Sequence, residues 1–265
     1  MTQASAEAEA LYQSLQATRA PLILTGAGVS TDSGIPDFRG PSGYWTKNQP
    51  VLFQDFVASE SVRLESWRKS FDSGLDFSQI QPNVSHYAVA ELMRQWPHAH
   101  LVTQNVDGLH QKAGNYPERI IEIHGNATYA SCLSCNTRYE LEAIQGQLEA
   151  KPNKAPSCVD CGGIVKRATI SFGQAMPEAE TERAFELAKN CDLILVLGTS
   201  LVVYPVAELP ETAVRHRAVF ALFNQQETPL DSLADIRSFS PLAEDMGALL
   251  EQLGNASALP AAATD

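Results

Sequence analysis

Five short apolar runs constrain the fold of this chain more than any other feature of its sequence. They are rich in Val, Ile and Leu, and stretches with helical character separate them. The runs lie at 21–25, 100–103, 119–124, 192–198 and 218–223. Strands of this composition are typical of a parallel sheet with helices on both faces, so an α/β fold is predicted. Helices are expected within 1–20 and at 53–71, 84–95, 177–189 and 241–253.

The segment 126–168 differs from the rest of the chain, because it has little apolar periodicity and several Pro and Gly residues. It carries two CxxC pairs, Cys132-x-x-Cys135 and Cys158-x-x-Cys161, with twenty-two residues between them. This spacing is close to that of structural zinc sites. Four thiolates complete a tetrahedral Zn²⁺ and leave no position for water, which indicates a structural role. A redox-active pair is the alternative, and the presence of two matched pairs favours metal. We therefore predict a small inserted zinc-binding module.

The acidic composition disfavours some classes of partner. The formal net charge is -12, and the electrostatic field of this charge repels nucleic acid phosphates. No nucleic acid binding is therefore expected, and a nucleic-acid-binding zinc ribbon is the least favoured class of protein. No apolar run approaches the roughly 18 residues of a membrane helix, so no membrane association is expected. The first residues lack the pattern of an export signal, which favours a cytoplasmic location. Cys191 is predicted to be a small core residue, and the oligomeric state stays open.

Small, amide, hydroxyl and imidazole residues follow the five predicted strands. In chain order these residues are Gly26, Ala27 and Gly28, then Gln104, Asn105 and Asp107, then His124, then Gly198, Thr199 and Ser200, and finally Asn224. Open parallel sheets bind their ligands beyond the carboxyl ends of the strands. A ligand site is therefore predicted at this edge of the sheet.

The first of these loops contains part of a dinucleotide-binding fingerprint. Gly26-x-Gly28 permits a tight turn and a close approach of the backbone to a pyrophosphate, as in a Rossmann-like fold. The third glycine of the fingerprint is absent, since Thr31 stands three residues after Gly28. The loop instead continues into an Asp-Phe-Arg tripeptide at 37–39. The charges of this tripeptide form either a surface ion pair or part of a ligand site.

Several longer motifs occur in the order found in one known family. GAGVSTDSGIPDFRG at 26–40 resembles the signature loop of the sirtuins, the NAD-dependent protein lysine deacylases. TQNVDGLH (103–110), the His124-Gly125 pair, the two CxxC pairs and GTSLVVYP (198–205) follow in that family's order. The resemblance covers roughly residues 15–250.

The resemblance implies that NAD is consumed as a co-substrate. In the family, the acyl-lysine oxygen attacks C1′ of the ribose, nicotinamide leaves, and the acyl group passes to ADP-ribose. His124 is then implied as the base that deprotonates the ribose, which suits the ordinary imidazole pKa. Asn105 is implied as the second catalytic residue. The expected partner is an acyl-lysine protein or peptide.

The resemblance also assigns binding residues. Those implied for NAD are Gly26, Ala27, Gly28, Ser30, Ile35, Asp37, Phe38, Arg39, Gln104, Asn105, Asp107, Gly198, Thr199, Ser200 and Asn224. Within this set, Ile35 and Asp37 are expected at the nicotinamide carboxamide and Phe38 over C1′. The residues implied for the peptide substrate are Phe172, Gly173, Val202 and Val203. The structural Zn²⁺ is assigned to Cys132, Cys135, Cys158 and Cys161.

The same resemblance implies a division of the chain. A Rossmann-like NAD-binding domain is expected to comprise 15–45, 84–125 and 169–252. The residues 46–83 are expected to form the helical part of a small domain, 126–168 the zinc-binding module and 254–265 a disordered tail.

Two departures from the family bear on substrate choice. Gln174 replaces the usual acid of the segment that contacts the substrate. Ser66 and Lys69 stand where members that prefer dicarboxylic acyl groups have Tyr and Arg, and nearby Trp67 resembles a branch associated with bulkier acyl groups. Deacetylation is therefore the default prediction. The alternatives are a protein mono-ADP-ribosyltransferase or NAD hydrolase that uses the same pocket, and a non-catalytic binding module.

Overall fold

The computed structural model describes residues 6–37, 49–72 and 76–254 of the 265-residue chain. The predicted site residues Phe38 and Arg39 lie outside these ranges, as does nearly all of the tail that was predicted to be disordered.

A six-stranded parallel sheet forms the larger part of the molecule, in the order β3-β2-β1-β7-β8-β9. Its strands are β1 (Pro21–Thr25), β2 (His100–Thr103), β3 (Ile120–Glu122), β7 (Leu193–Leu197), β8 (Val219–Phe223) and β9 (Ile236–Ser238). Five of them confirm the predicted runs. The sixth, β9, was not predicted, because its three residues include Arg237 and give no apolar run.

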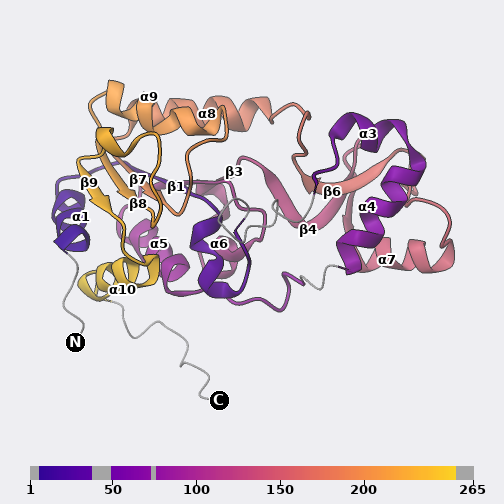
Figure 1. Ribbon diagram of the computed structural model, residues 1–265, viewed down its shortest axis with the longest axis horizontal. Helices are drawn as coiled ribbons and strands as arrows, with labels where there is room; N and C mark the ends of the chain where they lie inside the picture. The colour runs from indigo at the N-terminus through magenta and orange to yellow at the C-terminus, as the bar shows by residue number, and fades with distance from the viewer. Residues whose placement is uncertain (1–5, 38–48, 73–75, 255–265) are drawn as a thin grey trace, which may run out of the picture.

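Helices cover both faces of this sheet, as Figure 1 shows and as the sequence predicted. One face carries α1 (Ala6–Gln16), α5 (Val84–Gln95) and α10 (Leu242–Gln252), and the other carries α8 (Glu178–Asn190) and α9 (Leu209–Arg215). Successive strand residues point to opposite faces. In β1, Ile23 accordingly packs in the first layer and Leu22 and Leu24 in the second. Both layers consist of buried apolar side chains, which hold the strand ends in a fixed arrangement.

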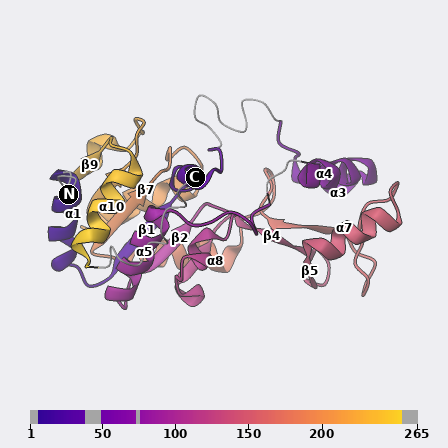
Figure 2. The ribbon, with the colours of Figure 1, turned by 90° about the horizontal axis from the view of Figure 1, so that it is seen from below.

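A second, antiparallel sheet lies at the far end of the molecule from α1 (Figure 2). Its order is β5-β4-β6, and its strands are β4 (Gly125–Cys132), β5 (Arg138–Glu140) and β6 (Val165–Thr169). Three helices accompany it: α3 (Phe53–Ala58), α4 (Glu60–Asp72) and α7 (Leu141–Ala150). The single helix predicted at 53–71 is therefore two, because Ser59 between them is extended. The short helix α6 (Leu109–Lys112) follows β2.

The small sheet has a hydrophobic cluster of its own, contrary to the weak periodicity of its sequence. Trp67 of α4 belongs to this cluster, is 2% exposed, and donates its indole N–H to the Val165 carbonyl over 3.3 Å. The side chain therefore packs against the small sheet and does not line the cavity described below.

Two histidines are buried in the main core. His86, in α5, accepts the Asn83 backbone N–H at Nδ1 (3.3 Å) and so helps to cap its own helix. His110, in α6, lies 3.0 Å from the Thr25 hydroxyl through Nε2. Their rings are 4.9 Å apart. Both side chains are buried, and neither is among the described residues that line the cavity.

We expect the stability of the fold to fall below neutral pH because of these two histidines. Burial lowers the pKa of His86 from 6.5 to about 4, and burial together with the charge of His86 lowers the pKa of His110 well below 6.5. The unfolded chain therefore binds more protons below pH 6.5. Stability is fully present above that value and is lost as the pH falls toward 4, at about 1.4 kcal/mol per pH unit for each histidine.

Urea unfolding midpoints between pH 7.5 and 5 measure this effect. Burial raises the pKa values of the Asp107 and Glu122 carboxyl groups, which is an effect of opposite sign that begins as the pH falls through the raised values and is complete below the ordinary values of 3.8 and 4.5, so the measured slope is the net of the two effects. The variant His98→Gln, at an exposed position, should keep the full slope. A flat profile between pH 7 and 5 would rule out the histidine effect.

None of the helices in the described ranges combines the length and the apolar character needed to cross a membrane.

Candidate functional site

A cavity of about 540 Å³ lies at the carboxyl ends of β1, β2, β7 and β8, where the sequence predicted a ligand site. The predicted residues that line it are Gly26, Ala27, Gly28, Asp37, Gln104, Asn105, His124, Phe172, Gly173, Gly198, Thr199, Ser200, Val203 and Asn224. Ser30, Ile35, Asp107 and Val202 are not among its described lining residues. The structure thus brings most of the predicted site together around one space.

The glycine loop after β1 is locked against the loop after β7. The Gly28 N–H donates to the Gly198 carbonyl over 2.9 Å, and the Gly26 N–H donates to Leu197 over 3.0 Å. A Cβ on Gly26 would lie 2.6 Å from the Thr199 Cβ, and one on Gly28 would lie 2.8 Å from the Gly198 Cα. The absence of a side chain at Gly26 and Gly28 therefore allows the two loops to contact each other. This contact forms the floor of the cavity.

Asn105 is positioned by hydrogen bonds from beneath the cavity. Its side-chain amide donates to the Gly26 carbonyl (3.0 Å) and to the Ser30 hydroxyl (3.1 Å). Its buried Oδ1 has no hydrogen-bond partner among the described residues. An unpaired buried carbonyl oxygen is costly, and a ligand that donates a hydrogen bond would remove the cost. The carboxamide of nicotinamide is a donor of this kind.

Ser30 and Asp107 support Asn105 from behind. The Ser30 hydroxyl donates to Asp107 Oδ2 over 2.7 Å, and the Leu109 N–H donates to Asp107 Oδ1 over 2.9 Å. Burial raises the pKa of Asp107, and these two hydrogen bonds oppose the rise. Asp107 faces a second hollow, on the side of Glu122 and Asn126, so in this conformation it acts through Ser30.

His124 lies at the junction of the two sheets. Its Nδ1 is 3.2 Å from the Gln104 carbonyl, and its own carbonyl accepts the Ile170 N–H over 2.8 Å. A carbonyl can only accept, so Nδ1 carries the proton in the neutral ring and Nε2 carries the lone pair. A neutral imidazole held in this way is suited to take up a proton at Nε2.

Gly125 explains why a glycine follows this histidine. Its φ is +74°, and a Cβ there would lie 2.0 Å from the Ala168 carbonyl oxygen in the neighbouring strand β6. Only glycine allows β4 to start this close to β6.

Gln174 holds the turn after β6 through hydrogen bonds with Ser171. Its side-chain Oε1 accepts the Ser171 backbone N–H over 3.1 Å, and its backbone N–H donates to the Ser171 carbonyl over 3.0 Å. The turn after β6 is therefore held by an uncharged acceptor. Phe172 in this turn is 42% exposed, and its carbonyl accepts the Phe53 N–H over 2.9 Å.

Several lining residues were outside the predicted set, among them Gln225, Gln226 and Leu242. The two glutamines directly follow Asn224, so the position after β8 was a usable signal. Leu242 begins α10, and nothing in its local sequence indicates a cavity.

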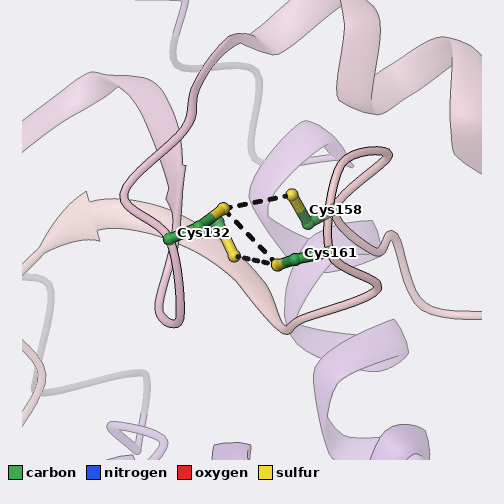
Figure 3. A group of neighbouring side chains, drawn as sticks. Cys132, Cys158 and Cys161 are labelled. Carbon is green, nitrogen blue, oxygen red and sulfur yellow. Dashed lines mark hydrogen bonds between the residues drawn. The ribbon is translucent and has the colours of Figure 1, made fainter.

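The four paired cysteines converge at one point in the small sheet (Figure 3). The sulfurs of Cys135 and Cys158 are 3.5 Å apart, those of Cys135 and Cys161 are 3.4 Å apart, and those of Cys132 and Cys161 are 3.5 Å apart. All four cysteines are free of disulfides. Four sulfurs at about 2.3 Å from one tetrahedral ion lie about 3.8 Å from one another. The cluster therefore fits a structural zinc ion.

Hydrogen bonds favour the thiolate form at Cys158 and Cys132. At Cys161, a backbone hydrogen bond from Gly163 is outweighed by the neighbouring thiols, which raise the pKa of Cys161 to about 12. The Tyr139 hydroxyl donates to Cys158 Sγ over 3.0 Å, which lowers the pKa of that thiol to about 6. The Ser134 N–H donates to Cys132 Sγ over 3.4 Å. Donors of this kind orient the ligands of a metal site.

The parallel sheet, the interlocked glycine loops and the four-thiol cluster together define a dinucleotide-binding α/β protein with a structural metal module. Residues 26–205 match the model of the Sir2 family. The chain belongs to that family.

Similar proteins agree with this assignment. The NAD-dependent protein deacetylase 1 of Bradyrhizobium diazoefficiens is 44% identical over 223 residues, which cover 84% of this chain and 87% of that protein. The NAD-dependent protein deacylase of Aquifex aeolicus is 37% identical over 81% of this chain and 87% of its own. A solved structure of Sir2 with a p53 peptide and NAD+ superposes with a TM-score of 0.83 at 34% identity, covering 93% of this chain and 98% of that one.

Proposed function

We propose that this chain is an NAD-dependent protein lysine deacylase, with deacetylation as its default activity. The observation that carries the proposal is the presence, at one cavity, of the His124 imidazole, held at Nδ1 by the Gln104 carbonyl, and of the Asn105 amide oxygen, which has no hydrogen-bond partner among the described residues. Relatives of the same family that bear the names deacetylase and deacylase support it. NAD supplies a glycosidic bond whose cleavage releases nicotinamide and leaves ADP-ribose as the acceptor of the acyl group.

The chain's own residues have three tasks in this reaction. Asn105, supported by Ser30, holds the nicotinamide carboxamide through its free Oδ1. The main chain of Gly28 and Gly198 shapes the floor on which the pyrophosphate lies. His124 accepts the proton of a ribose hydroxyl at Nε2 when the acyl oxygen has attacked C1′, which prepares the hydroxyl for acyl transfer.

The peptide substrate is proposed to lie between two segments at the mouth of the cavity, 172–173 and 202–203. Val202 is 47% exposed and Tyr204 is 65% exposed, although both are large apolar or aromatic residues. An extended peptide that pairs with such a segment gains main-chain hydrogen bonds and covers these side chains. The excess of acidic residues in the chain favours the approach of lysine-rich peptides.

A single incubation tests the proposal. The protein is mixed with acetyl-, propionyl- and longer acyl-lysine peptides and with NAD labelled in its adenine moiety. Equal amounts of nicotinamide, deacylated peptide and O-acyl-ADP-ribose are the expected products. Label that ends on protein would point to ADP-ribosyl transfer instead, and free ADP-ribose without peptide turnover would point to NAD hydrolysis. The absence of nicotinamide release with every peptide would contradict all three.

The cellular location is also part of the proposal. The four clustered cysteines form no disulfide, which suits a reducing compartment and favours the cytoplasm.

A further inference from the structure

Arg237 is nearly buried at the sheet edge, behind the loop that closes the far end of the cavity. It lies in β9 opposite Leu222 of β8, and its side chain is 12% exposed. The loop that leaves β8 carries Asn224, Gln225 and Gln226, and all three residues line the cavity.

The guanidinium of Arg237 contacts this loop at two points. Nη1 donates to the Asn224 carbonyl over 2.8 Å, and Nη2 donates to the Gln226 carbonyl over 2.8 Å. Nη1 also donates to the Ser238 carbonyl. The planar fork thus contacts both ends of the 224–226 loop.

A carboxylate fixes the guanidinium in turn. Nε of Arg237 donates to Asp231 Oδ1 over 2.9 Å, and the Thr228 hydroxyl donates to the same oxygen over 2.7 Å. The Phe239 ring covers the guanidinium, with its centroid 3.6 Å from Cζ. The side chain is therefore held on three sides, and its orientation is not free to adjust when the loop moves.

The position of the loop along the cavity indicates what it binds. His124 and Asn105 mark the end of the cavity where the nicotinamide bond is cleaved under the proposed function. Asn224 and Gln226 follow β8, which lies two strands beyond β1 in the sheet. A dinucleotide with nicotinamide at the first end places its adenosine half at the second.

We infer that Arg237 is a positioning residue for NAD, which holds the 224–226 loop in the conformation that receives the adenosine half. It does so through the Asn224 and Gln226 carbonyls and without lining the cavity itself. This inference rests on the proposed function, since it takes NAD to be the ligand. The conservative replacement by lysine cannot reproduce it, because one ammonium group cannot hold two carbonyls and a carboxylate in a planar fork.

Binding of ADP-ribose, followed by calorimetry, tests the inference without turnover. Arg237→Lys and Arg237→Gln are each expected to weaken binding roughly 10-fold, equivalent to one lost charge-assisted contact. Arg215→Gln, which removes an exposed pair with Glu211 on α9, is the control and should have no effect.

Kinetics and hydrogen exchange separate positioning from general damage. The lysine variant should raise KM for NAD about 10-fold while kcat and KM for the acyl peptide stay within about twofold. In the absence of ligand, the rate of amide hydrogen exchange in Arg237→Lys should exceed that of the wild type in 224–228 and equal it in α9. This measurement also applies to a variant that is too unstable for kinetics.

Three results would overturn the inference. These are equal ADP-ribose binding by wild type and Arg237→Lys, an equal loss in Arg215→Gln, or a rise of both KM values with a parallel fall in kcat. Failure of the wild type to bind ADP-ribose would overturn the proposed function as well, and so the two failures are distinguishable.

Discussion

Replacement of His124 by alanine is expected to lower the rate of deacylation by about 100- to 10,000-fold, the usual contribution of a general acid–base group. The imidazole takes up a ribose proton in the proposed reaction, and no other described histidine lines the cavity. The side chain is half-buried, and its hydrogen bond to the Gln104 carbonyl is long at 3.2 Å, so the loss of stability should be small. Steady-state turnover of an acetyl-lysine peptide and the thermal midpoint measure the two effects.

Two controls make this result specific to the imidazole. His98→Ala, at an exposed position, should keep full activity. The His124→Ala variant itself should still bind ADP-ribose, since the glycine loops and Asn224 are unchanged. Wild-type turnover by His124→Ala would remove this residue from the mechanism.

Removal of the metal is expected to unfold the small sheet and abolish activity. Metal ligation in such modules contributes on the order of 10–16 kcal/mol in peptide models, and the hydrophobic cluster around Trp67 is small by comparison. Chelation, or the variant Cys158→Ser, should therefore expose Trp67, which is 2% exposed in the folded protein. A red shift of tryptophan fluorescence together with zinc release, measured with a chromogenic chelator, reports the event.

Cys191→Ser provides the matched control for this experiment. Cys191 is buried beside β7, outside the thiol cluster, and burial and the charge of Asp192 raise the pKa of its thiol to about 12. Its replacement should leave zinc content unchanged. Chelation that stripped the metal and left both fluorescence and activity intact would contradict a structural role.

The sequence predicted what depends on local patterns. Five strands were recognised because Val, Ile and Leu repeat without interruption in each, and their order at one sheet edge followed from parallel pairing. The thiol cluster was predicted because two CxxC pairs at this spacing have few alternative uses. His124 was identified because the resemblance supplied its role. Its position at the end of a strand agreed with that role.

Contacts between segments that are distant along the chain could not be predicted from the sequence. Gly26 and Gly28 were assigned to the approach of a pyrophosphate, yet their lack of a side chain is needed for the contact with Gly198 and Thr199 across the sheet. Trp67 resembled a substrate-specificity position, whereas it packs against Val165. Arg237 gave no signal, because its partners lie in another strand and loop. The domain boundaries and the individual binding roles remain predictions.

The location of His124 between the two sheets has a mechanical consequence. Its side chain is fixed by Gln104 at the end of β2, and its main chain is fixed by Ile170 at the end of β6. Any rotation of one sheet against the other therefore changes the aim of the imidazole. The thiol cluster lies at the opposite end of β4 and β6. By fixing the two strands there, it helps to maintain the orientation of the His124 imidazole.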